Sequence, residues 1–211
     1  MKESAPTPCN EPKPVPLLDV VQGNAPLRDQ VLAAITKVVD SGWFLHGPDC
    51  RELEAEVARR CQVPAAVSCA SGSDALLLAM MALEIGPGDE VILPSFTFFA
   101  TASCVWRTGA TPVFVDVDPL TFNIDPQCVE AAVTRATKAI IPVHLFGQCA
   151  EMDVINGIAE RHQLYVVEDA AQAIGARYRD RAAGAWGHVG CFSFYPTKNL
   201  GGMGDGGMLT A

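Results

Sequence analysis

The feature that most constrains the fold is an alternation of short apolar runs with amphipathic stretches, which starts near residue 65. Alternation of strands and helices at this spacing predicts βαβ units with right-handed crossovers and a mostly parallel sheet. We therefore expect an α/β fold with helices flanking the sheet. The predicted strands are 65–69, 90–93, 112–115, 139–143, 164–167, 190–194 and 207–210, and the predicted helices between the earlier strands are 73–83, 97–107, 126–134 and 152–162.

Three segments are expected along the chain. Residues 1–16 are rich in proline and polar side chains, which predicts a flexible tail. Residues 17–64 are expected to form an N-terminal helical segment, in which Asn24 and Pro26 suit a helix cap and a first-turn proline. Residues 65–211 are expected to form the α/β domain.

Composition excludes several classes of function. The net charge is −9, from 15 basic and 24 acidic residues, and no Lys/Arg cluster interrupts this balance. Such a chain is not expected to bind nucleic acid or an anionic membrane surface. No apolar run reaches the length of a membrane span, and the first residues lack the apolar core of a signal peptide. We therefore expect a cytoplasmic protein.

Cysteines and histidines do not suggest a metal site. The eight cysteines include no C-x-x-C pair and are spread through predicted strands and helices. We expect most of them to be small buried residues in a reducing compartment. The four histidines show no metal-ligand spacing to one another or to the cysteines, so no metal is expected.

A lysine near the end of the chain is the first candidate for catalysis. An aromatic strand in the segment 191–202 runs into a bend at Pro196, and Lys198 follows with glycines directly after it. A lysine enclosed by apolar strand ends is partly desolvated, which favours the nucleophilic amine that a Schiff base requires. Taken alone, the segment also fits a lysine in a surface loop.

A carboxylate after another predicted strand is the second candidate. The β-branched run 164–167 leads into Glu168 and Asp169, and small residues follow. In open α/β sheets, ligands bind outside the carboxyl ends of the strands. A carboxylate placed there can pair with a protonated ring nitrogen, as pyridoxal phosphate requires. The same Asp169 also fits the cap of a following helix.

The turn after the first predicted core strand can bind an anion. Ser71, Gly72 and Ser73 precede an apolar helix, and backbone N–H groups at a helix N-terminus with hydroxyls beside them form an anion site. The alternative is a plain capping turn. The segment 202–207 also matches G-x-G-x-x-G, but it precedes a predicted strand instead of opening a helix, so a dinucleotide site is not expected.

Four segments together resemble a known family. They are Ala70-Ser71-Gly72-Ser73-Asp74-Ala75-Leu76, Pro94-Ser95-Phe96-Thr97-Phe98-Phe99-Ala100-Thr101, Val167-Glu168-Asp169-Ala170-Ala171-Gln172-Ala173 and Phe192-Ser193-Phe194-Tyr195-Pro196-Thr197-Lys198-Asn199. In order and spacing they resemble the PLP-dependent sugar aminotransferases of the DegT/DnrJ/EryC1/StrS family. The resemblance covers nearly everything after Pro16, and it implies the large domain of the fold type I PLP-dependent transferases for residues 65–211.

The resemblance also implies a role for each candidate residue. Lys198 would form the Schiff base with pyridoxal 5'-phosphate (PLP) and shuttle a proton, and Asp169 would keep the ring nitrogen protonated. Phe98, which the residues alone would assign to the core, aligns with the aromatic that stacks on the ring. The backbone of Gly72 and Ser73 and the hydroxyl of Ser193 would hold the phosphate, and Gln172 would bond the phenolic oxygen.

The implied reaction transfers an amino group from glutamate or glutamine to a nucleotide-linked keto sugar, in a cytoplasmic homodimer. The sugar and the pathway, for a surface polysaccharide, an antibiotic or another glycoconjugate, stay open. Three alternatives remain: a sugar dehydratase of the family that uses pyridoxamine phosphate and typically replaces the lysine with histidine, a non-catalytic regulatory relative that binds PLP, and a nucleotide-binding oxidoreductase. Lys198 argues against the first.

Length is the main departure from the family. Family members continue well beyond the point that corresponds to residue 211. The C-terminal small domain is therefore expected to be missing, with the residues that a partner subunit adds to the site. We expect this 211-residue chain to bind PLP weakly and to turn over slowly or not at all.

Overall fold

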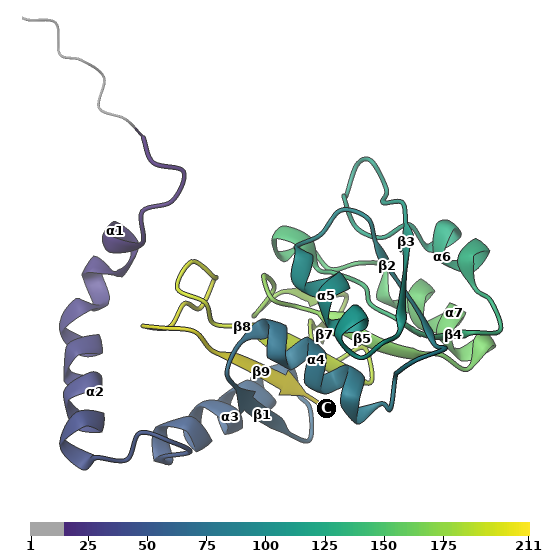
Figure 1. Ribbon diagram of the computed structural model, residues 1–211. Coiled ribbons are helices and arrows are strands. Elements are labelled where there is room, and N and C mark those ends of the chain that lie inside the picture. The colour runs from purple at the N-terminus through teal and green to yellow at the C-terminus, as the bar shows by residue number, and fades with distance from the viewer. Residues whose placement is uncertain (1–14) are drawn as a thin grey trace, which may run out of the picture. The chain divides into compact units, whose positions relative to one another are not determined.

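The computed structural model describes residues 15–211 (Figure 1). The chain divides into two compact units, residues 1–41 and 42–211, which are described separately. Most of the expected flexible tail, residues 1–14, lies outside the described residues. Within residues 15–211, no helix is long and apolar enough to span a membrane.

The first unit is helical. It contains α1 (Val20–Asn24), a 3-10 turn η1 (Ala25–Leu27) and α2 (Arg28–Ser41). Pro26 lies in the first turn of η1, as predicted, but the side chain of Asn24 makes no capping hydrogen bond there. Asp19 is the residue that caps, because its side chain accepts a hydrogen bond of 2.8 Å from the Gln22 amide at the start of α1.

The second unit is built on a seven-stranded sheet with the order β1-β9-β8-β5-β4-β2-β3. All strands run in one direction except β9, which pairs antiparallel with β1 and β8. The predicted mostly parallel sheet is therefore confirmed. The strands are β1 (Ala66–Cys69), β2 (Glu90–Pro94), β3 (Thr111–Val115), β4 (Thr137–Ile140), β5 (Tyr165–Asp169), β8 (Val189–Ser193) and β9 (Gly207–Thr210).

Helices cover both faces of this sheet. Alternate residues of a strand point to opposite faces, so each strand can contribute apolar side chains to both layers of helices. On β2, Val91 and Leu93 join the apolar cluster that includes residues of α4 and α5, whereas Ile92 joins the cluster that includes residues of α6 and α7. The helices are α3 (Pro48–Cys61), α4 (Gly72–Ala82), α5 (Phe99–Arg107), α6 (Pro126–Ala132) and α7 (Met152–His162).

Two features of the second unit were not expected from the sequence. A small hairpin, β6 (Arg177–Tyr178) and β7 (Arg181–Ala182), forms a separate two-stranded sheet. In addition, α3 packs with the α/β unit, since Val57 and Cys61 share an apolar cluster with Phe192 and Met208 of the sheet. The expected domain limit between residues 64 and 65 stays a prediction.

Candidate active site

All seven sequence-predicted site residues line one cavity of about 500 Å³ at the carboxyl ends of the parallel strands. They come from four places: the turn from β1 into α4, the start of α5, the end of β5 with the segment after it, and the end of β8 with the segment after it. The seven residues are Gly72, Ser73, Phe98, Asp169, Gln172, Ser193 and Lys198. The fold thus gathers residues more than a hundred positions apart in the sequence, as expected for this edge of an open α/β sheet.

The N-terminus of α4 forms one wall. The Ser71 side chain caps the helix by accepting a hydrogen bond of 3.0 Å from the Asp74 amide. The first-turn N–H groups of Gly72 and Ser73 have no intrahelical acceptor, as in any helix, so they are free to bind an anion. The backbone is close to β8 here, because a Cβ built on Gly72 would lie 2.6 Å from the Cβ of Ser193.

Asp169 ends β5 and is held from several directions. One carboxylate oxygen accepts a hydrogen bond of 2.8 Å from the Thr101 hydroxyl of α5, and the other accepts one of 3.2 Å from the Ala171 amide. Burial raises the pKa of the Asp169 carboxyl above its usual value, while these two hydrogen bonds and the positive charge of Lys198 oppose the rise. No helix follows β5 directly, so Asp169 is not a helix cap.

Lys198 lies in the turn after β8. The turn is closed by a hydrogen bond of 2.8 Å from the Lys198 amide to the Tyr195 carbonyl. Gly201 lets the chain fold back tightly, because a Cβ there would lie 2.3 Å from the Pro196 carbonyl oxygen. Lys198 is half-buried and lines the same cavity as Asp169, whose pKa its charge lowers. Lys198 and Asp169 therefore line one cavity and interact electrostatically.

Phe98 and Gln172 complete the predicted set. Phe98 is 71% exposed at the start of α5, so it does not belong to the apolar core. Gln172 lines the cavity, and its side-chain oxygen accepts a hydrogen bond of 2.8 Å from the Phe146 amide, which leaves its NH₂ group available as a donor.

The cavity has further polar lining residues that sequence reasoning missed. They are Thr97, His144, Tyr195, Thr197 and Asp205. His144 was detectable, because a polar residue that follows an apolar strand of a parallel sheet lies at the ligand-binding edge. Thr97 was hidden in an aromatic run that is typical of a core, and nothing in its local pattern marked it.

A buried hydrogen-bonded cluster surrounds Glu168, the residue before Asp169 on β5. Glu168 is fully buried, and its Oε2 accepts hydrogen bonds of 2.8 Å from the Gly184 amide and from His144 Nε2. Its Oε1 accepts two bonds of 2.6 Å from the Trp186 and Gly187 amides. His144 Nδ1 accepts from the Ala150 amide, so Nε2 must carry the proton that is donated to Glu168.

Cysteines within the described residues take no part in the cavity lining. All seven are free thiols. Cys61, Cys104 and Cys191 are buried, whereas the other four are partly exposed, so fewer cysteines are buried than the sequence predicted. Burial raises the pKa of Cys104 to about 12 and that of Cys61 to about 11. Residues 15–211 contain no group of three or more His, Cys, Asp or Glu side chains that fits a metal ion.

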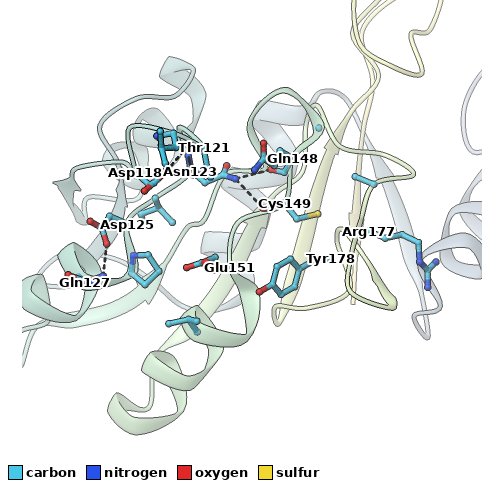
Figure 2. Close-up of a pocket in the computed structure, with 16 residues that line it drawn as sticks. Asp118, Thr121, Asn123, Asp125, Gln127, Gln148, Cys149, Glu151, Arg177 and Tyr178 are labelled. Carbon is cyan, nitrogen blue, oxygen red and sulfur yellow. Dashed lines mark hydrogen bonds between the residues drawn. The ribbon is translucent and has the colours of Figure 1, made fainter.

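A second and larger cavity, of about 920 Å³, lies between the β6–β7 hairpin and the segment 118–127. Figure 2 shows the Asn123 side chain reaching toward Gln148 and Cys149, whose carbonyls accept its amide hydrogens at 3.2 and 3.1 Å. The lining contains the carboxylates of Asp118, Asp125 and Glu151 and a single arginine, Arg177. This charge balance disfavours phosphate, so we assign the site to the smaller cavity.

Comparison with known proteins agrees with the family resemblance of the four sequence segments. Residues 26–211 match the model of the DegT/DnrJ/EryC1/StrS aminotransferase family. Over 195 residues, which is 92% of this chain, the chain is 54% identical to a UDP-N-acetyl-3-dehydro-alpha-D-glucosamine 3-aminotransferase of Acidithiobacillus ferrooxidans and covers 53% of it. It is 52% identical, over 92% of this chain and 52% of the relative, to a protein of Geobacillus stearothermophilus named as a pleiotropic regulatory protein.

Solved structures show the same fold. The crystal structure of Streptomyces venezuelae DesV in complex with a ketimine intermediate superposes with a TM-score of 0.91 at 51% identity, over 93% of this chain and 53% of that one. The PLP form of a putative sugar aminotransferase from Streptococcus pneumoniae gives a TM-score of 0.83 at 34% identity, over 86% and 50%. The expected fold is confirmed, and the chain spans about half the length of these relatives.

Proposed function

Because the chain belongs to the DegT/DnrJ/EryC1/StrS aminotransferase family, we propose that the protein is a PLP-dependent aminotransferase. It transfers an amino group from an amino acid, glutamate or glutamine, to a nucleotide-linked keto sugar. The observation that carries this proposal is the shared cavity, in which an amine at Lys198, a buried carboxylate at Asp169 and the open N-terminus of α4 lie together.

The residues of the cavity fit the phosphate of PLP. The N–H groups of Gly72 and Ser73 supply donors and the positive end of the helix dipole, and the hydroxyls of Ser73 and Ser193 can add two more donors. Space is provided by small residues, because a Cβ on Gly207 would lie 2.2 Å from the Ser71 carbonyl oxygen and displace this turn. The family resemblance and this cradle support the same placement.

The residues of the cavity also fit the pyridine ring. Asp169 can accept a hydrogen bond from the protonated ring nitrogen, because the Thr101 and Ala171 bonds leave lone pairs on its carboxylate. The exposed ring of Phe98 offers a stacking surface, and the Gln172 NH₂ group offers a donor to the phenolic oxygen. Together these contacts would fix the ring's position and plane.

Lys198 is then the group that moves protons. When bound, PLP supplies an electron sink that stabilises the carbanion of the amino-acid substrate. The Lys198 Nζ would hold the cofactor and, when its amine is free, would take a proton from the substrate Cα as a general base. Asp169 acts by charge, because its carboxylate favours the protonated ring nitrogen.

The partners of the reaction follow from the relatives. Several are named for nucleotide-linked amino sugars, which supports a UDP- or dTDP-linked keto sugar as the acceptor. We also propose a cytoplasmic homodimer. Phe99, Phe146 and Tyr195 are at least half exposed and are in, or adjacent in sequence to, the cavity lining, which suits an interface with a second copy. Sedimentation that gives only monomers, with and without PLP, would refute the dimer.

The experiment that tests the function begins with PLP binding. Purified protein is titrated with PLP and followed by the visible absorbance of the lysine-bound form, and Lys198→Ala is expected to lose this band. Lys138→Ala is the matched control, because Lys138 lies over the Tyr165 ring outside the cavity lining. The loaded protein is then given glutamate or glutamine with a panel of nucleotide-linked keto sugars, and the amino sugar is measured by mass spectrometry.

The outcomes separate the candidate functions. Amino-sugar formation supports the aminotransferase. PLP binding without any turnover by a full-length protein would support a regulatory role, which the name of the Geobacillus stearothermophilus relative keeps open. In the 211-residue chain, slow or absent turnover is already expected for an aminotransferase. Removal of a sugar hydroxyl without amino transfer would support the dehydratase, which the presence of Lys198 disfavours. A wild-type protein with no lysine-bound absorbance would refute both the aminotransferase and the PLP-binding regulatory protein.

A further inference from the structure

The carboxylate of Asp169 is held by a chain of two hydroxyl groups that extends to the cavity wall. Thr101 Oγ1 donates to Asp169 Oδ2 at 2.8 Å, and Thr97 Oγ1 lies 2.9 Å from Thr101 Oγ1. Thr101 is fully buried within α5, whereas Thr97 precedes this helix and lines the cavity. Asp169 itself is 5% exposed.

The direction of the hydrogen bonds follows from the carboxylate. An ionised carboxylate only accepts, so the Thr101 hydroxyl must give its one hydrogen to Asp169. The Thr101 oxygen then accepts, and the hydrogen between the two threonines must come from Thr97. The Thr97 hydroxyl has no second hydrogen, so it presents only lone pairs to the cavity.

We propose that Thr101 is a positioning residue that orients the Asp169 carboxylate toward the cofactor's ring nitrogen and favours its ionised form, with Thr97 holding Thr101 in turn. This inference rests on the proposed function. A buried carboxylate that lacks donors protonates, and a protonated Asp169 would have no negative charge to pair with a protonated ring. The Thr101 bond is charge-assisted and shielded from water, which makes it one of the stronger kinds of hydrogen bond.

Other charged and titratable groups also face Asp169 and have to be separated from the effect of Thr101. The groups that interact electrostatically with Asp169 are Lys198 in the turn after β8, His144 in the segment after β4, Cys104 on α5 and Cys191 on β8. A Thr101 substitution leaves all four in place. A change in the titration of Asp169 therefore reports the lost hydroxyl.

The test compares Thr101→Val, which has nearly the shape of threonine but no hydroxyl, with Thr101→Ser, which keeps the hydroxyl. Thr108→Val is the matched control, because the Thr108 hydroxyl bonds only the Val105 carbonyl at the end of the same helix. The first measurement uses protein without cofactor. The Asp169 carboxyl carbon is followed by NMR over pH in protein labelled with ¹³C-aspartate, and its resonance is assigned by Asp169→Asn.

Thr101→Val is expected to move the Asp169 titration to higher pH and to lower PLP affinity about tenfold, the loss of one hydrogen bond to a charged group. Thr101→Ser is expected to restore both properties, and Thr108→Val to change neither. A Thr101→Val protein that titrates like wild type would overturn the proposal. If Thr101→Val does not fold, Thr97→Val gives the second test, since the proposal requires a smaller shift in the same direction.

Failure of the proposed function would be seen separately. Wild-type protein that never shows lysine-bound absorbance would refute the PLP assignment, whatever the carboxyl titration gives. Normal PLP binding by wild type together with unchanged titration and unchanged affinity in Thr101→Val would refute only the role of Thr101.

Discussion

Replacing Glu168 with glutamine is expected to destabilise the fold more than any other single charge removal in the described chain. Glu168 is fully buried, and each of its oxygens accepts two hydrogen bonds. Glutamine keeps one carbonyl oxygen but turns an NH₂ group toward two donors. The two hydrogen bonds that the replaced oxygen accepted are therefore lost. The two buried donors that made them then face the NH₂ group of glutamine, which is itself a donor.

Hydrogen bonds to charged groups contribute about 1.5–3 kcal/mol each, and breaking a buried ionic cluster costs about 3–5 kcal/mol. The expected loss is therefore about 4 kcal/mol, out of a total stability of about 5–15 kcal/mol for an ordinary domain. With a urea m-value of about 2 kcal/mol/M, the unfolding midpoint falls by about 2 M.

The measurement is urea unfolding followed by tryptophan fluorescence. Glu130→Gln is the matched control, because Glu130 pairs with Arg161 and His162 at the surface and exposed pairs contribute little. Its midpoint is expected to stay close to that of wild type. A Glu168→Gln protein with the wild-type midpoint would refute the view that the hydrogen bonds of this carboxylate hold the segment 184–187 to β5.

Two further outcomes are expected from local geometry. Gly207→Ala should weaken PLP binding at least about tenfold, because the new Cβ displaces the Ser71 turn. Gly204→Ala is the control and should bind PLP normally, because no atom lies within 4 Å of the added Cβ. Equal PLP affinities of the two variants would contradict the phosphate cradle. Glu54→Ala should lower stability by about 1 kcal/mol at neutral pH, because the hydrogen bond from the Ser68 hydroxyl, and then that from its amide, hold the pKa of Glu54 below its usual value. A lowered carboxyl pKa contributes its full stability above the pKa of the unfolded chain and loses it as the pH falls further. The difference in stability between wild type and Glu54→Ala should therefore shrink as the pH falls below about 4.5. Thermal unfolding at several pH values measures this difference.

Sequence periodicity was sufficient to predict where the strands of the seven-stranded sheet and the helices around it lie in the sequence. The apolar run 207–210 and the amphipathic run 152–162 coincide with β9 and α7, because burial on one or both faces leaves a clear pattern. The β6–β7 hairpin was missed, since its strands of two residues are too short for any periodicity. The antiparallel direction of β9 was also hidden, because strand pairing depends on contacts between distant segments.

Site residues could be predicted from the sequence where the proposed PLP chemistry requires a particular residue type. Lys198 and Asp169 could be proposed from their positions after predicted strands, and the family resemblance added Gln172 and Phe98. Thr101 could not be proposed in this way, because it lies inside a helix and bonds another side chain, and the bond from His144 to Glu168 was equally hidden in the sequence. Such partners become visible only when the fold brings α5 and the segment after β4 against β5.

The most direct test of the central claim is to identify which lysine holds the cofactor. The protein is incubated with PLP, reduced with borohydride to make the link permanent, digested and mapped by mass spectrometry. The chain has five lysines, so the experiment discriminates among them. We expect the pyridoxyl group on Lys198, and its loss from that peptide when Asp169→Asn weakens the site. Modification of Lys138, or equal modification of several lysines, would contradict the account.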